Sequence, residues 1–366
     1  MNHFSDIVGQ DAIRDHLQDA VKTGRISHAY ILDGPKDSGR HFIAGIFAAA
    51  VQCTDIQSDQ NGMPEPCGSC ISCIQADAGS QPDIIYVRRR PKNGKIPRVL
   101  SVEEIRQMRD DAAVKPYASA RKIYIVEDAE LMNTQAQNAL LKTLEEPPAY
   151  VVIILIADGT SRFLPTVMSR CITLHMKQVP EETMIRFLMK ERGISEEKAR
   201  LCASFAAGNL GRAVKIADDP DFDNQRKDAE QILAGITEMS FTDIVNIAND
   251  IFPKKKTGAD ENAAAGDEGK KKESIHHLLP DCIPLWYRDV CRLKAGGSTE
   301  GLILSDCAEK TGKAADEISY EGIERILREI SEYQRELTTT SPETALQLLL
   351  VKIRDELRAA EKAKKK

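Results

Sequence analysis

The sequence predicts an α/β fold, in which helices cover both faces of a parallel sheet, a cysteine module is inserted into this core, and only helices follow it. Three observations lead to this prediction. Short, fully apolar segments alternate with helical patterns in the first half of the chain, four closely spaced cysteines interrupt that alternation, and strand signals disappear after about residue 176. Short apolar strands separated by helices are typical of a parallel sheet buried on both faces.

The strands are predicted, in chain order, at residues 29–34, 83–87, 122–128, 151–158 and 171–176. Helical patterns lie between them at 41–53 and 101–114, and the second begins with a capping box formed by Ser101 and Glu104. This alternation predicts a doubly wound sheet.

The second half of the chain predicts helices only. Two amphipathic helices end at Gly193 and Gly208, a third opens near Gly211, and helical patterns continue from about residue 237. Trp286, the single tryptophan, is predicted to be a core residue. Residues 254–273 are polar and of low complexity, so we expect a disordered loop there.

The composition limits the class of protein. A chain of 366 residues is long enough for two or three domains. The longest apolar run, 150–157, is far too short to span a membrane, and no secretion signal opens the chain. Nine cysteines, only four of them clustered, fit a reducing compartment. We therefore expect a soluble, cytoplasmic protein without a membrane partner.

The charge distribution bears on nucleic-acid binding. A formal net charge of −6 argues against a chain that coats nucleic acid by bulk electrostatics. The basic stretch 88–98 is a local exception, and it suits either contact with DNA phosphates or a solvated loop.

The clustered cysteines predict a metal site. Cys53, Cys67, Cys70 and Cys73 have the spacing C-x13-C-x2-C-x2-C, and two residues between cysteines allow both sulfurs to face one ion. Four thiolates match tetrahedral zinc, and a closed site of this kind is structural rather than catalytic. An iron–sulfur cluster and four free thiols are the alternatives.

The stretch GPKDSGRH, residues 34–41, has the glycine spacing of a phosphate-binding loop and lies between a predicted strand and a predicted helix. Gly34 and Gly39 fit that pattern. Arg40 and His41, however, stand where such a loop carries a lysine that reaches the phosphates and a hydroxyl that holds magnesium. Histidine is a poor magnesium ligand, because magnesium strongly prefers oxygen.

An acidic pair departs from the ATPase pattern as well. Glu127 and Asp128 end the third predicted strand in the order Glu-Asp, whereas a working site would present Asp-Glu there. Two independent departures argue against ATP hydrolysis by this chain. Nucleotide binding without hydrolysis stays open, because amides at a helix N-terminus can still hold phosphate. A simple glycine-containing turn is the alternative.

Two further stretches carry a family resemblance. NALLKTLEEPP (138–148) and FLPTVMSRC (163–171), in their context of strands, resemble the AAA+ subunits of bacterial sliding-clamp loaders. Weaker similarities are FSDIVGQDAIRDHLQDAV at the start, SHAYILDGP, the cysteine insertion, GNLGRAVKIA (208–217) and SPETALQLLLVKI (341–353), so the resemblance extends over nearly the whole chain.

The resemblance implies roles for individual residues. Arg170, in the Ser-Arg-Cys motif at 169–171, would project as an arginine finger toward ATP on a neighbouring subunit, where such arginines stabilise transition-state charge. A local ion pair is the alternative role for Arg170. Arg212 resembles a residue that senses nucleotide, although its role here would be structural if no nucleotide binds. Residues 158–160 occupy a second sensor region but do not match its pattern.

The resemblance also implies an AAA+ core at 1–176 with a zinc module at 53–73, a helical lid at 177–236 and a helical collar at 237–366. The expected function is that of a non-hydrolysing subunit in a pentameric clamp loader of bacterial DNA polymerase III, without polymerase activity. Its expected partners are motor (gamma/tau) and delta subunits, the sliding clamp and primer-template DNA. An active motor ATPase and a zinc-dependent nucleic-acid-binding module are the alternatives.

Overall fold

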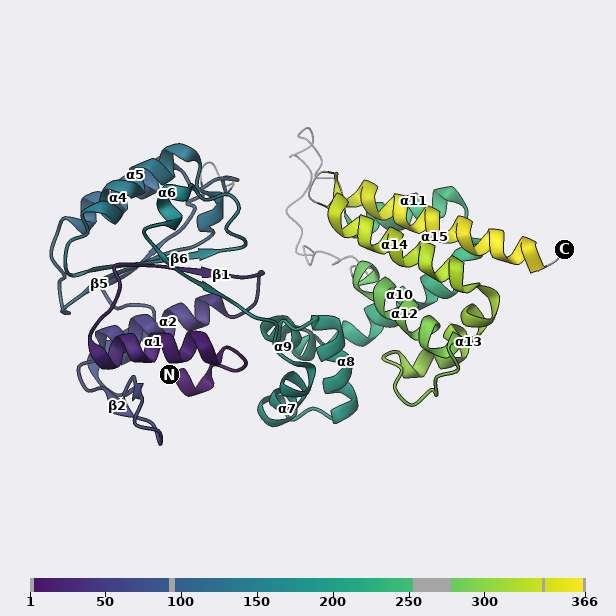
Figure 1. Cartoon of the computed structure of the whole chain (residues 1–366), viewed down its shortest axis with the longest axis horizontal. Helices are drawn as coiled ribbons and strands as arrows, with labels where there is room; N and C mark the ends of the chain where they lie inside the picture. Colours follow the sequence, from purple (N-terminus) through teal and green to yellow (C-terminus); the bar gives the residue numbers. More distant parts are fainter. Residues whose placement is uncertain (1–2, 92–95, 253–277, 338–339, 365–366) are drawn as a thin grey trace, which may run out of the picture. The chain divides into compact units, whose positions relative to one another are not determined.

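The computed structural model describes residues 3–91, 96–252, 278–337 and 340–364 (Figure 1). The chain forms two compact units. Unit 1 comprises residues 1–187 and 207–213, and unit 2 comprises residues 188–206 and 214–366. The described helices are too short or too polar to span a membrane.

The helices and strands of unit 1 alternate as the sequence predicts. In chain order they are η1 (Phe4–Asp6), α1 (Asp11–Thr23), β1 (Ala29–Asp33), α2 (Arg40–Gln52), β2 (Gln57–Ser58), β3 (Pro64–Glu65), α3 (Ile71–Asp77), β4 (Ile84–Val87), α4 (Val102–Ala112), β5 (Lys122–Val126), η2 (Ala129–Leu131), α5 (Thr134–Glu145), β6 (Val151–Ala157), α6 (Pro165–Met168), β7 (Ile172–His175) and the start of α7 (Glu181–Arg192).

The five longer strands form one parallel sheet in the order β4-β5-β6-β1-β7. All seven residues of β6 are buried, and they alternate between two hydrophobic cores. Ile153 and Leu155 belong to the core under α4, α5 and α6, whereas Ile154 and Ile156 belong to the core under α1 and α2. Figure 1 shows these two groups of helices on opposite faces of the sheet. The fully apolar strand is thus explained by burial on both faces.

The segment inserted between α2 and α3 contains structure that the sequence did not reveal. No strand was predicted between Cys53 and Cys67, but β2 and β3 pair there as a short antiparallel hairpin. The predicted capping box of α4 is confirmed, since the Ser101 N–H donates to Glu104 Oε2 at 3.1 Å.

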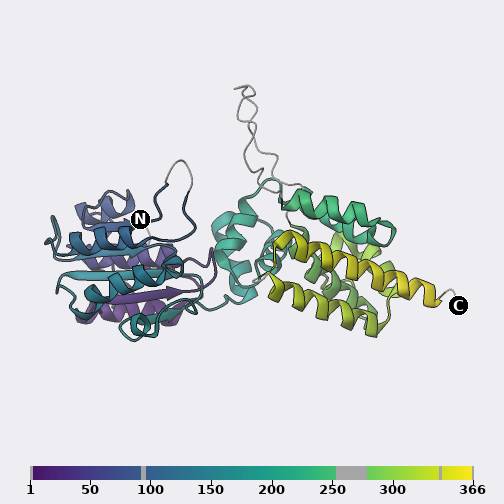
Figure 2. The same ribbon diagram turned by 90° about the horizontal axis from the view of Figure 1, so that it is seen from above.

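Unit 2 is helical throughout its described residues. Its elements are the end of α7, α8 (Glu196–Ala206), most of α9 (Leu210–Asp218), α10 (Phe222–Ala234), η3 (Ile236–Glu238), α11 (Phe241–Ile251), α12 (Leu279–Lys294), η4 (Ser305–Cys307), α13 (Ala308–Glu317), α14 (Tyr320–Glu336) and α15 (Pro342–Lys364). Figures 1 and 2 show α14 and α15 side by side. Trp286 lies in α12 and is 1% exposed, which confirms it as a core residue.

The predicted fold class is therefore confirmed: a parallel α/β core with an inserted cysteine module precedes a helical second half. The predicted lid, 177–236, is shared between the two units, because the division passes through α7 and α9. Its separation from the core and from the collar remains a prediction. The predicted disordered loop at 254–273 lies outside the described residues.

Candidate functional site

The phosphate-loop sequence lies where its pattern predicts, between the carboxyl end of β1 and the first residue of α2. Gly34 continues β1, and its N–H donates to the carbonyl of Ala157 in β6. Gly39 has φ +92°, a left-handed conformation that glycine adopts easily. Arg40 begins α2 and is buried, whereas the His41 side chain is 54% exposed. The loop therefore has its expected position without the usual lysine and hydroxyl.

Residues 207–213, which include the first turn of α9, pack on this loop within unit 1. Asn209 Nδ2 donates to the carbonyl of Lys36 at 2.7 Å. A Cβ on Gly211 would lie only 2.1 Å from the carbonyl oxygen of Asp37, so only glycine allows this approach. The Arg212 N–H donates to Asn209 Oδ1 at 3.1 Å. The predicted sensor residue is thus next to the two residues that contact the phosphate loop.

Little space is left between these segments. A cavity of about 70 Å³ is lined by Pro35 and Ser38 of the loop, by Gln10, by residues 176–179 and by residues 207–210. Pockets for small molecules commonly enclose about 300–1,000 Å³. This cavity is therefore smaller than a usual small-molecule pocket.

Two arginines neutralise the acidic pair. Arg88 Nη2 lies 2.8 Å from Glu127 Oε1, and Arg89 Nη2 lies 2.7 Å from Asp128 Oδ2. His41 Nε2 is 3.9 Å from the same Glu127 oxygen. The carboxylates that would act beside a metal in an active relative are thus already paired with cations of this chain.

These ion pairs were not predicted from the sequence, although strand register explains them. β4 and β5 are parallel neighbours, and Val87 lies opposite Val126. Residues that follow the two strands must therefore also lie side by side, which places Arg88 and Arg89 beside the acidic pair. The signal in the sequence was a run of arginines directly after a strand. From the sequence this run suited contact with DNA phosphates or a solvated loop.

The second sensor region lies at the same edge of the sheet. The Gly159 N–H donates to Asp33 Oδ1 at 2.9 Å, and Asp33 Oδ2 lies 2.8 Å from His175 Nδ1. The Asp158 N–H donates to Glu130 Oε2 at 3.1 Å. These contacts hold the ends of β1, β6 and β7 together around the phosphate loop.

Arg170 lies in the turn between α6 and β7, and its side chain is 35% exposed. Its Nη1 donates to the carbonyl of Thr166 at 2.8 Å, and its Nη2 lies 3.0 Å from Glu145 Oε1. The neighbouring Cys171 packs against the core, and burial raises the pKa of its thiol to about 12. The local ion pair predicted as the alternative role of Arg170 is thus present, and Cys171 beside it is a partly buried anchor.

The four predicted metal ligands come together. Cys53, Cys67, Cys70 and Cys73 place their sulfur atoms within 4.8 Å of one another, with 4.0 Å between Cys53 and Cys70 and 3.9 Å between Cys67 and Cys73. Four sulfurs at the tetrahedral zinc distance of about 2.3 Å would lie roughly 3.8 Å apart. The cluster therefore fits one tetrahedral zinc ion.

Hydrogen bonds prepare these sulfurs to bind a cation. The N–H groups of Cys67, Cys70 and Cys73 donate to the sulfurs of Cys53, Cys67 and Cys70, respectively, at 3.3–3.4 Å. Burial would by itself raise the pKa of Cys70, but hydrogen bonds from Thr54 and Cys73 lower it to about 6. Burial raises the pKa of the Cys53 and Cys73 thiols. A bound divalent cation would favour the thiolate form of all four.

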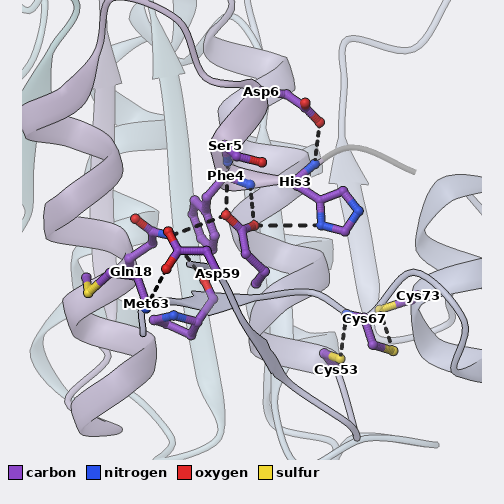
Figure 3. A network of polar contacts seen from close by, with 12 residues as sticks. His3, Phe4, Ser5, Asp6, Gln18, Cys53, Asp59, Met63, Cys67 and Cys73 are labelled. Carbon is purple, nitrogen blue, oxygen red and sulfur yellow. Dashed lines mark hydrogen bonds and ion pairs between the residues drawn. The ribbon is translucent and has the colours of Figure 1, made fainter. Parts of the chain in front are cut away.

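A polar network ties the cysteine loop to the start of the chain. Glu65, which lies in β3 just before Cys67, is buried and accepts the N–H groups of Phe4 and Ser5 at 2.6 and 3.0 Å. Figure 3 shows Phe4, Ser5 and Gln18 gathered beside the loop that carries the cysteines. The loop thus also holds η1 in place. Burial raises the pKa of Glu65, although these N–H groups act in the opposite direction.

Comparisons with known proteins agree with this architecture. Residues 9–180 match the protein family described as "DNA polymerase III, delta subunit". This part of the chain is therefore similar to that family.

Similar proteins carry related names. The chain is 28% identical over 359 residues to "DNA polymerase III subunit tau" of Bacillus subtilis, an alignment that covers 96% of this chain and 61% of that protein. It is 32% identical over 187 residues to "DNA polymerase III subunit gamma" of Buchnera aphidicola, which covers 51% of this chain and 48% of the relative. The chain thus spans about half to three fifths of the length of these relatives.

A solved structure from Thermotoga maritima, of a DNA polymerase III gamma subunit-related protein, aligns with 94% of this chain and all of that one. The identity is 18% and the TM-score is 0.41.

Proposed function

We propose that this chain is a non-hydrolysing, delta-prime-like subunit of the clamp loader of a bacterial DNA polymerase III. In this role it presents Arg170 to ATP bound by an adjacent motor subunit of the gamma/tau type, within a pentamer that also contains a delta subunit. The motor hydrolyses ATP while the assembly loads the sliding clamp on primer-template DNA in the cytoplasm. The chain itself has neither ATPase nor polymerase activity.

One observation carries the proposal: the groups that would act on ATP are either replaced or already paired. Arg40 and His41 replace the lysine and hydroxyl of the phosphate loop. Glu127 and Asp128 are engaged by Arg88 and Arg89. A carboxylate paired with a guanidinium is a weaker metal ligand, because the metal must displace a cation that is already bound.

The environment of Arg170 supports the second half of the proposal. Its guanidinium is partly exposed, and a neighbouring Cys171 fixes the turn that carries it. A guanidinium delivered to the γ-phosphate from outside an ATP site can raise the hydrolysis rate by about 10³–10⁵. The zinc site, in contrast, would stabilise the loop between α2 and α3 and take no part in hydrolysis.

A second candidate function is that of an active gamma/tau-like motor. It is favoured by the match to the tau subunit over 96% of this chain. In that case the 207–213 segment would move away from the phosphate loop when nucleotide binds, and the purified chain would hydrolyse ATP with magnesium.

The test uses the full chain in two settings. Alone, with ATP and magnesium, it should show no turnover. Mixed with a gamma/tau-type subunit whose own Ser-Arg-Cys arginine is changed to alanine, it should restore DNA-stimulated hydrolysis. Arg170→Ala should then reduce the restored rate by about 10³. Arg162→Ala is the matched control. It removes an exposed arginine just before α6, the helix that precedes Arg170, and it should leave the rate unchanged.

The outcomes separate the two candidates. Turnover by the chain alone, maintained through purification that removes contaminating ATPases, would identify an active motor. A restored rate that is indifferent to Arg170→Ala would refute the arginine-finger role.

A further inference from the structure

We infer that Glu145 is the positioning residue for Arg170: its carboxylate orients the guanidinium before the neighbouring subunit arrives. The inference rests on the proposed function and adds a residue to it. Glu145 belongs to the NALLKTLEEPP stretch, whose resemblance to clamp loaders was recognised from the sequence without any role for this side chain.

Two contacts from two different helices hold the guanidinium. Glu145 is the last residue of α5, and its Oε1 lies 3.0 Å from Arg170 Nη2. The carbonyl of Thr166 in α6 accepts a hydrogen bond from Nη1 at 2.8 Å. Because the two contacts bind different nitrogens of one planar group, together they fix its orientation as well as its position.

The Glu145 carboxylate belongs to a helix, α5, that is held firmly in place. α5 is capped at its start by Asn133, whose Oδ1 accepts the Ala136 N–H at 2.8 Å, and the side chains of Leu140 and Leu144 are buried in the core. Gln137, also buried, donates to the carbonyl of Arg162 at 2.9 Å and accepts the Leu164 N–H at 2.7 Å. These bonds join α5 to the segment that leads into α6. The two helices that hold Arg170 are therefore fixed to each other.

The Arg170 guanidinium is also stabilised by its location beside the C-terminal end of α5. The C-terminal end of an α-helix carries partial negative charge, so a cation beside the last turn of α5 is stabilised. The carboxylate of Glu145 acts in the same direction. Both interactions favour the arginine rotamers that reach toward the end of α5 over those that extend freely into solvent.

The pair is also weak enough to rearrange. The side chains of Arg170 and Glu145 are 35% and 48% exposed. Exposed ion pairs of this kind are weak, because water screens them and both side chains lose freedom when they pair. Phosphate oxygens accept two parallel hydrogen bonds from a guanidinium and carry more charge than one carboxylate. Glu145 can therefore orient the finger and release it when a γ-phosphate is presented.

Glu146 provides a matched control, because it is the next residue, has the same side chain and is exposed. Glu145→Gln removes the charge and keeps the shape. We expect Glu145→Gln to lower kcat of the restored ATP hydrolysis by about two- to fivefold, which corresponds to the strength of an exposed ion pair. The KM for ATP should stay unchanged, since nucleotide is bound by the motor subunit. Glu146→Gln should change neither constant.

A double-mutant cycle in the same mixed assembly tests whether Glu145 acts through Arg170. If it does, Arg170→Ala and Arg170→Ala/Glu145→Gln should have equal rates. A further loss in the double variant, an increase of kcat in Glu145→Gln, or equal effects of Glu145→Gln and Glu146→Gln would overturn the inference. Thermal unfolding of each variant serves as the check on folding.

Failure of the inference is distinct from failure of the proposed function. If Arg170→Ala abolishes the restored hydrolysis and Glu145→Gln has no effect, only the positioning role is wrong. If Arg170→Ala itself has no effect, the proposed function is wrong.

Discussion

At the scale of single residues, buried charges are paired with specific partners. In unit 2, Arg226 is 5% exposed and forms ion pairs with Glu230 and Asp306, and Cys307 Sγ donates to Glu230 Oε2 at 2.7 Å. The group resembles a metal site in composition, since Glu230, Asp306 and Cys307 lie close together. Arg226 already supplies the positive charge, however, and burial raises the pKa of the Cys307 thiol to about 12, so the cluster is structural.

The Asp306 carboxylate should make unit 2 sensitive to acid. The hydrogen bond from Arg226 lowers the pKa of Asp306, so its contribution to stability is fully present above the unfolded value of about 3.9 and is lost as pH falls through the lower folded value. Asp306→Asn should destabilise unit 2 by about 1 kcal/mol at pH 7, because nearly half of the side chain is exposed. The free energy of unfolding of unit 2 should also fall less steeply below about pH 4 in this variant.

The measurement is urea unfolding at several pH values followed by Trp286 fluorescence, which reports on unit 2 alone. Glu230 does not contribute to the loss of stability at low pH. Burial raises its pKa, so its contribution changes in the opposite direction and is lost as pH rises. Glu309→Gln, at an exposed pair with Lys313, is the control. If unit 2 of Asp306→Asn loses stability below about pH 4 as steeply as the unchanged protein does, Asp306 is not the group responsible.

At the scale of elements, one buried carboxylate shapes the connection between α4 and β5. Asp83, 1% exposed, accepts the N–H groups of Tyr117, Ala118 and Ser119 at 2.6–2.8 Å. Asp83 directly precedes β4, the strand paired with β5, and the three donors come just before β5. The carboxylate therefore fixes the chain where it enters the sheet.

Asp83→Ala should destabilise unit 1 by about 2–3 kcal/mol, because three backbone N–H groups lose their acceptor. Asp83→Asn keeps one acceptor oxygen and should cost less. Hydrogen exchange at the amides of residues 117–119 is the direct measurement. Exchange should accelerate in Asp83→Ala, and unchanged protection at all three amides would show that the carboxylate does not hold the loop.

At the scale of the whole molecule, the two compact units bury separate cores, and the cysteine cluster lies in unit 1. Metal bound there would link α2, the β2–β3 hairpin and α3, and through Glu65 it would support η1. We therefore expect the two units to respond differently when zinc is withdrawn.

Chelation of zinc should lower the unfolding midpoint of unit 1 and leave that of unit 2 in place. Loss of only about 2 kcal/mol would shift the midpoint of a domain of this size by roughly 4–8 °C. Calorimetry combined with Trp286 fluorescence separates the transitions. Cys70→Ser should release the metal, whereas Cys291→Ser, a change in unit 2, should not. Equal metal content in both variants would contradict the predicted site.

The candidate site was predictable to different degrees. The cysteine cluster was predicted fully, since ligand spacing alone limits which sulfurs can meet around one ion. Arg170 was singled out by family resemblance, but its contact with Glu145 was not, because these residues are 25 positions apart and meet only through the packing of α5 and α6. The partners of Glu127 and Asp128 depended on the register of β4 and β5.

The sequence by itself determined the order of the strands in the parallel sheet segment of the chain, the clustering of the four cysteines and the presence of Arg40 and His41 where a phosphate loop usually has lysine and a hydroxyl. These properties depend on local periodicity, on glycine and on the kind of side chain at a fixed position. Only the tertiary structure decided that Arg88 and Arg89 neutralise the acidic pair, that Asn209 and Gly211 contact the phosphate loop, and that Glu145 pairs with Arg170. Each of these contacts joins segments distant in sequence, so its geometry exists only once the sheet has formed and its helices have packed.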